Sequence, residues 1–276
     1  MKYNHIALLL TVLASSASCG NKSNTEAQAM LRDIQAEIEC GQYSHALEIM
    51  DSLDSRFPAA TSERSEALKL RPKAMEGYTI NQISVADSIL MATQQMIENL
   101  SSGFEHIVNP KLVENYYVIK SAKKANLMTS TAIEPRVDED YNFYLVGSLT
   151  GNDIGLYAIE LTIGETTARS NEIPSGDERV FTSALGTKAV FSESDAEEIG
   201  KLAADSDASK GIITFIGRKG SKKLNLTAGE VEAIGNSYLY SKAHKNLMLA
   251  KIRREKLERQ LQIARNQIAN SDGYDQ

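Results

Sequence analysis

The chain has 276 residues, of which 42% are apolar and 24% are charged, a composition typical of a folded globular protein. Its formal net charge of −6 gives no excess of cations to neutralise phosphates, so we expect no nucleic acid partner. The four histidines lie far apart in the sequence, and no Cys-x-x-Cys or His-Glu-x-x-His spacing occurs. We therefore expect no metal and no cofactor.

Residues 1–19 carry an export signal. Lys2 gives a short positive start, residues 6–14 form an apolar run, and the small residues 16–18 lead directly to Cys19. The apolar run is shorter than the roughly 20 residues that a permanent membrane-spanning helix needs. The segment resembles the signal peptide and lipobox of bacterial lipoproteins. The resemblance implies that Cys19 becomes the acylated first residue of the mature protein, carrying lipid such as palmitate. An ordinary secretory signal cleaved nearby is the alternative, and it also exports the chain.

The residues after Cys19 indicate which side of the membrane the protein faces. Residues 20–24 are small and polar, as expected for a tether, and no acidic run follows the cysteine. In Bacteroidetes-type lipoproteins, which the segment resembles in general style, an acidic run at this place marks export to the outer face. The resemblance therefore implies a lipid-anchored protein of the cell envelope, held in the outer membrane and facing the periplasm. The lipid bilayer is its first expected partner.

Residues 25–78 are expected to be helical. Apolar side chains recur at helical spacing over residues 26–59, and Gly41 and Pro58 punctuate this stretch in the manner of an antiparallel helix pair. The run from Gly41 through Tyr43 and Ala46 to Pro58 resembles the second helix of a tetratricopeptide repeat. No second copy is obvious, so the resemblance implies a single repeat-like hairpin that packs on its own protein. Such hairpins commonly bind other proteins.

Cys40 stands at the end of the first apolar helical pattern. With Cys19 acylated it has no partner for an intramolecular disulfide, and we expect it to be buried as a small hydrophobic residue. A helix over residues 62–74 is expected to extend the bundle.

A long helix is expected over residues 79–109. Its apolar side chains, from Ile83 to Ile107, alternate spacings of three and four, which is a heptad seam. Met91 and Met96 are expected to fill the core rather than to form a binding face.

The C-terminal residues 228–270 predict a second long helix, followed by a polar tail over residues 271–276. Thr227 and Glu230 form a capping box before it, and no proline interrupts it. We expect the two long helices to pair antiparallel as a coiled coil. Alternatively, the seams leave a groove for a helix from another protein or from a second copy.

Residues 114–227 change to a period of two and predict a small β-rich domain. A single helix is expected within it, beginning at Ser194, with Glu197 completing a capping box, and running to about Asp205. The expected strands are Tyr116 to Ile119, Phe143 to Leu149, Leu156 to Ile163, Thr166 to Ser170, Ala189 to Phe191, Ile212 to Ile216 and Leu224 to Leu226. The fold class is thus α+β, with a helical hairpin and long helices flanking a barrel-like or sandwich-like domain.

Two charged segments of the β-rich region are candidate ligand sites. Residues 138–142 place oxygen ligands at alternate positions, but Phe143 and Leu149 stand where a calcium-binding EF-hand loop needs Gly and Glu. A hairpin turn is therefore favoured. The basic run 218–223 could bind a phosphate or an anionic lipid head, but a solvated hairpin is favoured, because charged turns discourage aggregation at strand edges.

The sequence contains no nucleophile elbow, phosphate-binding loop or dinucleotide fingerprint. Together with the export signal and the heptad seams, this favours a non-catalytic, membrane-anchored scaffold that binds an envelope protein or another copy of itself. The alternative is a β domain that binds or hydrolyses envelope glycan or peptide. It would use a cleft lined by aromatic side chains or carboxylates, and the first residues to inspect are Tyr141, Phe143, Tyr144 and Tyr157.

Overall fold

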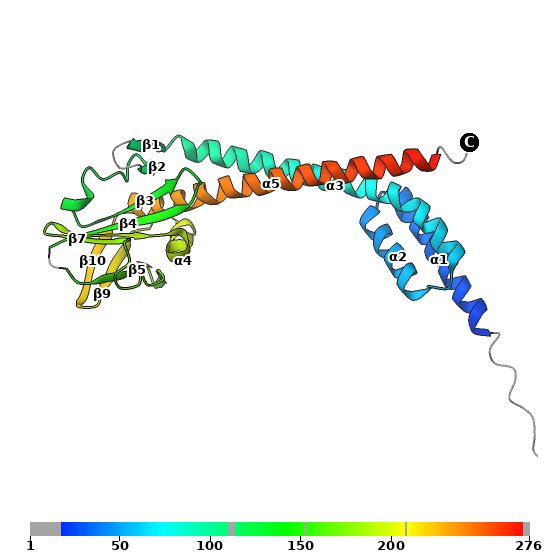
Figure 1. Cartoon of the computed structure of the whole chain (residues 1–276), viewed down its shortest axis with the longest axis horizontal. Coiled ribbons are helices and arrows are strands. Elements are labelled where there is room, and N and C mark those ends of the chain that lie inside the picture. The colour runs from blue at the N-terminus through cyan, green and yellow to red at the C-terminus, as the bar shows by residue number, and fades with distance from the viewer. Residues whose placement is uncertain (1–17, 110–113, 152, 208, 273–276) are drawn as a thin grey trace, which may run out of the picture. The chain divides into compact units, whose positions relative to one another are not determined.

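The computed structural model describes residues 18–109, 114–151, 153–207 and 209–272. Helices and two antiparallel sheets are both present, which confirms the α+β class (Figure 1). The chain divides into two compact units, one formed by residues up to 88 together with residues from 252 onward, and the other by residues 89–251. Of the expected signal, residues 1–19, the part from 1 to 17 lies outside the described residues. Among the described helices, none has the length and hydropathy needed to span a membrane.

The first unit is helical. It contains α1 (Ser18–Glu39), α2 (Tyr43–Arg56), the beginning of α3 (Thr61–Ser101) and the end of α5 (Ala228–Asp272). Gly41 turns the chain between α1 and α2 with a φ of +76°, a conformation that costs glycine little. The helix pair expected over residues 26–59 is confirmed. Its core holds Ala27, Ile34, Ile38, Ala46, Met50 and Leu53, together with Ala67 and Ala74 of α3.

Cys40 is exposed, so the prediction of a buried cysteine is wrong. The helical pattern ends one residue earlier, at Glu39, and Cys40 already belongs to the turn that leads to Gly41.

Helix α3 corrects two predictions. The expected helices over 62–74 and 79–109 are one continuous helix, which contains Pro72 and ends at Ser101. Phe104 and Ile107, assigned to the seam, lie instead in a strand. Their spacing suits a helix, but pairing with the next strand satisfies the backbone of residues 104–109, so tertiary context overrides the local pattern.

The heptad positions of α3 that remain helical are buried or half-buried: Ile83, Ala86, Leu90, Thr93, Ile97 and Leu100. Met91 is 72% exposed and Met96 is also exposed, so neither fills the core as predicted. In the first unit, Arg254 of α5 binds Asp87 of α3 at 2.5 Å and Arg265 binds Glu76 at 2.9 Å. These ion pairs join the two long helices.

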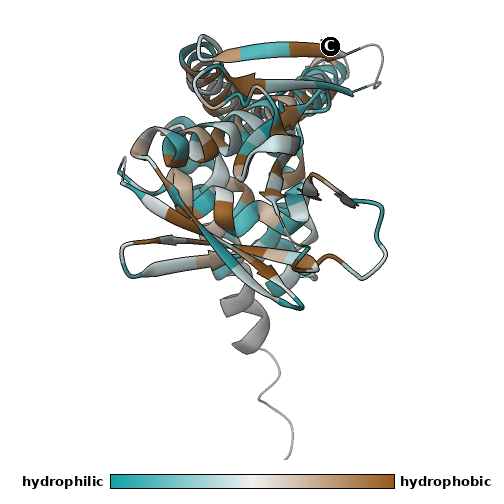
Figure 2. Ribbon diagram, turned by 90° about the vertical axis from the view of Figure 1, so that its left-hand side faces the viewer, coloured by the Kyte–Doolittle hydropathy of each residue, from teal (hydrophilic) through white to brown (hydrophobic). Residues whose placement is uncertain are grey.

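The second unit contains the two sheets. The six-stranded sheet has the order β1-β2-β3-β4-β8-β7, and the four-stranded sheet has the order β10-β9-β5-β6. Both apolar and polar residues occur along the strands, as Figure 2 shows by hydropathy. The strands are β1 (Phe104–Asn109), β2 (Glu114–Ile119), β3 (Ala132–Asp138), β4 (Phe143–Thr150), β5 (Leu156–Ile163), β6 (Thr166–Arg169), β7 (Val180–Ser183), β8 (Gly186–Phe191), β9 (Gly211–Gly217) and β10 (Gly220–Leu226), with a short 3-10 helix, η1 (Leu127–Thr129), before β3.

One core lies between the two sheets. Phe143, Leu145 and Phe191 from the six-stranded sheet meet Ile159 and Phe215 from the four-stranded sheet. The helix α4 (Glu193–Ala204) and the beginning of α5 contribute further apolar side chains to the same core. This arrangement is sandwich-like. All seven predicted strands are present, whereas β1, β3 and β7 were not predicted.

The N-terminal ends of α4 and α5 are the places where the two capping boxes were predicted. The Thr227–Glu230 box is confirmed, because Glu230 accepts the Thr227 backbone N–H at 3.0 Å. The predicted start of α4 is wrong by two residues, since Ser192 is its N-cap and Asp195 accepts the Ser192 backbone N–H at 3.0 Å. Serine is a good N-cap residue, so both Ser192 and Ser194 could begin the helix. Ser192 is the N-cap because the Asp195 carboxylate, three residues later, binds its backbone N–H.

Helices α4 and α5 approach closely at two glycines. A Cβ atom on Gly235 of α5 would lie 2.8 Å from the backbone carbonyl oxygen of Ala203, and one on Gly200 of α4 would lie 2.7 Å from the ring of Tyr238. Backbone atoms cannot swing aside as the end of a side chain can. The glycines therefore set the distance between these two helices.

Gly235→Ala is expected to lower the free energy of unfolding of the second unit by about 1–3 kcal/mol, because the helices must move apart. Gly229→Ala is the matched control in the same helix, since no atom lies within 4 Å of the added methyl group. It is expected to be neutral or to stabilise by up to about 1 kcal/mol. Urea unfolding followed by far-UV circular dichroism measures both, and equal effects would contradict the close approach.

Candidate ligand-binding site

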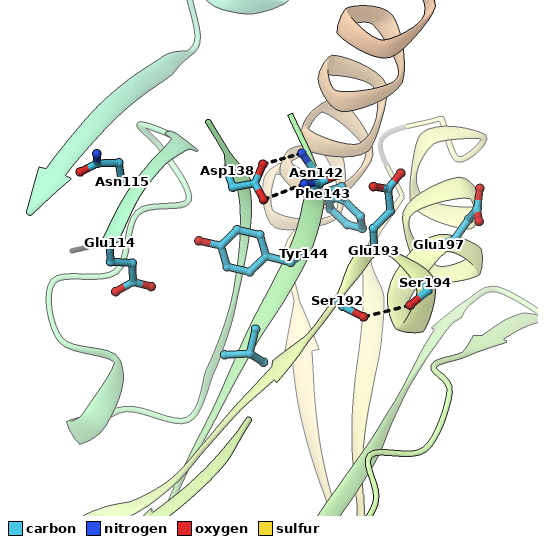
Figure 3. A pocket seen from close by; sticks show the side chains of 11 residues that line it. Glu114, Asn115, Asp138, Asn142, Phe143, Tyr144, Ser192, Glu193, Ser194 and Glu197 are labelled. Carbon is cyan, nitrogen blue, oxygen red and sulfur yellow. Dashed lines mark hydrogen bonds between the residues drawn. The ribbon is translucent and has the colours of Figure 1, made fainter. Parts of the chain in front are cut away.

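A cavity of about 740 Å³ lies in the second unit, against the face of the six-stranded sheet that points away from the core. Its size is within the range usual for ligand sites. Figure 3 shows the strands on one side and the start of α4 on the other. The lining residues come from β2, β3, β4, β8 and α4 or the turns beside them: Glu114, Asn115, Asp138, Asn142, Phe143, Tyr144, Val190, Ser192, Glu193, Ser194 and Glu197.

Strand alternation explains which side chains reach this face. Phe143 and Leu145 of β4 are fully buried in the core, so Tyr144 between them points to the opposite side. In the β3–β4 ladder Arg136 is the partner of Tyr144, and in the β2–β3 ladder Asp138 is the partner of Tyr116. The register therefore gathers charged and aromatic side chains from three strands.

A buried ion pair lies behind the wall of the cavity. Glu134 is 1% exposed and Arg136 is 5% exposed, and the Arg136 Nε atom donates to Glu134 Oε1 at 2.7 Å. Arg136 Nη1 also donates to Oε1 of Glu114 at 2.7 Å, and the guanidinium lies 3.8 Å from the ring centroid of Tyr116. The second carboxylate oxygen of Glu134 accepts the Lys124 backbone N–H at 2.6 Å. This network fixes the position of Glu114 in the wall.

Tyr144 keeps its proton in this setting. Burial raises the pKa of its hydroxyl to about 12, and the opposing effect of the Arg136 cation is smaller. At neutral pH the ring therefore presents an uncharged hydroxyl that both donates and accepts hydrogen bonds.

The wall formed by α4 is neutralised by two lysines of α5. Lys242 Nζ binds Glu197 at 2.8 Å and Glu193 at 3.4 Å. Lys245 also binds Glu193, and it donates to the side-chain oxygen of Asn142 at 2.9 Å. The hydrogen bond from Lys242 lowers the pKa of Glu197, so this carboxyl group stays ionised at neutral pH.

Residues 138–142 form the hairpin turn between β3 and β4, as predicted. The two carboxylate oxygens of Asp138 accept the backbone N–H and the side-chain amide of Asn142, at 2.7 and 2.9 Å. Tyr141 has a φ of +61°, which is uncommon for a residue other than glycine. Its carbonyl oxygen accepts the Ser241 hydroxyl at 2.6 Å and its ring stacks on His244, with centroids 3.6 Å apart. Contacts with α5 thus hold the turn.

Acidification is expected to lower the free energy of unfolding of the second unit through protonation of His244. Its Nε2 atom is buried without a hydrogen-bond partner among the described residues, and burial lowers the pKa of the imidazole below 6.5. The unfolded chain then binds the proton more readily, so the stability due to neutral His244 is complete above pH 6.5 and is lost as the pH falls towards its folded pKa.

The urea midpoint of the wild type, measured between pH 7.5 and 5.5, is expected to fall more than that of His244→Phe. The variant keeps an aromatic ring against Tyr141 but cannot take up a proton. Parallel changes in the two proteins would show that other groups titrate.

The four aromatic residues selected from the sequence do not share one site. Tyr144 and Phe143 both line the cavity, although the Phe143 side chain is fully buried and packs in the core. Tyr141 packs against α5. The ring of Tyr157 lies 5.2 Å from the guanidinium of Arg218, beside a different cavity of about 350 Å³. Residues 218–223 form the β9–β10 turn and the start of β10, as the hairpin interpretation predicted.

Sequence reasoning missed Glu114, Glu134 and Arg136. A proline inside a segment disfavours a central strand, and Pro135 stands between Glu134 and Arg136, so the local sequence gives little sign of the face that carries them. The charged residues on either side of Pro135 were the available signal. Within the described part of the chain, no group of three or more His, Cys, Asp or Glu side chains is arranged to hold a metal ion. The side chain of Cys19 lies outside the described residues.

The sequence matches no family model, and comparisons with curated proteins and with solved structures find no similar protein. The function is therefore inferred from the residues of the site itself.

Proposed function

We propose that this chain is a lipid-anchored, non-catalytic protein of the cell envelope that binds a partner protein. Acylation of Cys19 would hold it in the outer membrane, facing the periplasm. The cavity in the second unit would receive a segment of the partner. The export signal of the sequence supports the anchor, and the geometry of the cavity supports binding.

The observation that carries the proposal is the ionic pairing around the cavity. Glu114, Glu193 and Glu197 each bind a cation of the same unit. A general acid or base works best with a pKa near the operating pH. Here the pKa of Glu197 is lowered and that of Tyr144 is raised, so both are held in their ordinary charge states. This favours recognition over proton transfer, and hydrolysis of glycan or peptide is the less well supported alternative.

The long helices belong to the same proposal. We infer that α3 and α5 pair antiparallel as a coiled coil, because the heptad positions of both helices are buried or half-buried and ion pairs join them in the first unit. In α5 these positions are Leu247, Ala250, Leu257, Leu261, Ala264 and Ile268. The seams would then be used within one chain. A partner helix or a second copy would bind elsewhere on the protein, and the repeat-like hairpin of α1 and α2 is a candidate surface.

The anchor is tested by metabolic labelling with an alkyne analogue of palmitate, followed by membrane fractionation. The wild type is expected to incorporate label and to sediment with membranes, whereas Cys19→Ala is expected to lose both properties. Cys40→Ala is the matched control and is expected to retain both, since Cys40 lies after α1. Labelling of Cys19→Ala would overturn the lipid anchor.

Partner binding is tested by photocrosslinking in cells from Asn115, which lines the cavity, with Glu165 as the control position in the β5–β6 turn. Mass spectrometry is expected to identify one envelope protein reproducibly from Asn115 and not from Glu165. The same captured proteins at both positions would count against a partner site at the cavity.

A further inference from the structure

We infer that the cavity takes a lysine or arginine side chain of the partner, held against the wall formed by Glu114 and Asp138. This inference rests on the proposed function and names the chemistry of the segment that the cavity recognises. It follows from an unequal distribution of charge between the two walls.

The α4 wall is balanced, because Glu193 and Glu197 face two lysines, Lys242 and Lys245. The opposite wall is not balanced. There Glu114 and Glu134 share one cation, Arg136.

Asp138 adds to this surplus, since its carboxylate oxygens accept hydrogen bonds from the uncharged backbone and side chain of Asn142. Glu139 lies beside the same wall, where its Oε2 atom accepts the side-chain amide of Asn115 at 3.2 Å. Among the described residues that line the cavity, none is an arginine or a lysine. A ligand cation is therefore attracted to this wall, and a phosphate or carboxylate is repelled.

The wall is also fixed before a ligand arrives. Arg136 and Glu134 are more than nine-tenths buried, and an ion pair so placed carries a large desolvation cost. The buried pair fixes the Arg136 guanidinium, and its Nη1 atom in turn holds the Glu114 carboxylate in place. Figure 3 shows Glu114 and the Tyr144 hydroxyl on the same side of the cavity, with Glu193 and Glu197 on the other. Fixed acceptors reduce the entropy lost on binding.

A protein side chain fits this cavity better than a sugar. Tyr144 offers its ring to the methylene stem or to the guanidinium of a basic side chain, and Val190 adds an apolar contact. Stacking of a sugar ring needs an exposed aromatic face, and the second aromatic residue of the lining, Phe143, is fully buried. The volume of about 740 Å³ exceeds that of one side chain, so flanking backbone of the partner also enters.

The test uses the lipidated full-length protein in detergent micelles and fluorescence anisotropy of dye-labelled pentapeptides. Each peptide is acetylated and amidated at its ends and has the sequence Gly-Ala-X-Ala-Gly, where X is lysine, arginine, glutamine or glutamate. The lysine or arginine peptide is expected to bind with a Kd at least about tenfold lower than the glutamine peptide, and the glutamate peptide more weakly still.

Glu114→Gln and Asp138→Asn are each expected to raise the Kd of the basic peptide about tenfold. Glu165→Gln, an exposed carboxylate in the β5–β6 turn, is the matched control and is expected to leave it unchanged. Far-UV circular dichroism establishes whether each variant is folded. If Glu114→Gln does not fold, the Kd of Asp138→Asn tests the inference.

Equal affinity for the lysine and glutamine peptides would overturn the inference, as would wild-type binding by both carboxylate variants. Displacement of the basic peptide by a glucosamine trimer but not by lysine amide would also overturn it and assign the cavity to amino sugars. A partner captured in cells from Asn115, with no preference for basic peptides, would leave the proposed function standing and reject the inference alone.

Discussion

Replacing Arg136 with methionine is expected to lower the free energy of unfolding of the second unit by about 3–5 kcal/mol, because it leaves a buried carboxylate without its cation. Glu134 is 1% exposed, and Arg136 Nε is its charged partner at 2.7 Å. The Lys124 backbone N–H remains as a donor, but it cannot neutralise the charge. Urea unfolding at pH 7, followed by far-UV circular dichroism, measures the loss.

Two further variants show whether burial causes this effect. Arg169→Met removes an exposed Arg169–Glu172 pair and is expected to cost at most about 1 kcal/mol. The double variant Arg136→Met/Glu134→Gln removes both charges and is expected to recover part of the stability lost in the single variant. A double variant no more stable than Arg136→Met would mean that lost packing, rather than the unpaired charge, explains the defect.

Phe215→Ala is expected to destabilise the second unit by about 3–5 kcal/mol through the cavity that it leaves in the core. Phe215 is fully buried on β9 and packs across the space between the two sheets. A Cβ atom added to Gly147 of β4 would lie 3.0 Å from its ring, which shows how closely the facing strand approaches. The loss should appear as a lower urea midpoint with an unchanged slope.

Phe181→Ala is the matched control for Phe215→Ala. Phe181 lies on the edge strand β7 and is 59% exposed, so its truncation is expected to change the stability by no more than about 0.5 kcal/mol. Similar losses in the two variants would contradict the assignment of Phe215 to the shared core.

Local patterns identified most of the β-rich unit but not its central strand β3. The bounds predicted for β5, Leu156 to Ile163, are those that the structure shows. In β3, residues 132–137 are all buried, because one face meets the core and the other supports the buried ion pair. With Pro135 inside it, the segment shows neither alternation nor an apolar run.

Local sequence patterns also identify little of the candidate site, because its contacts join residues far apart in the chain. Tyr144 could be selected because it is aromatic and lies in a predicted strand. The pairing of Glu114 with Arg136 joins residues 22 positions apart, and it depends on the antiparallel pairing of β2 with β3. The lysines of α5 that neutralise the α4 wall are about 50 residues away from their partners, a separation that no local spacing rule covers.

The contacts of the β3–β4 turn with α5 make the cavity sensitive to the axial position of that helix. Ser241 and His244 both contact Tyr141, at its carbonyl oxygen and its ring. Lys245, little more than one helical turn after Ser241, binds Asn142 and Glu193. A shift of α5 by one residue, about 1.5 Å, would break these contacts together. Occupancy of the cavity and the position of α5 are therefore thermodynamically linked: a ligand that favours one helix position strengthens it, and a force or partner that displaces α5 lowers the affinity of the cavity by the same free energy.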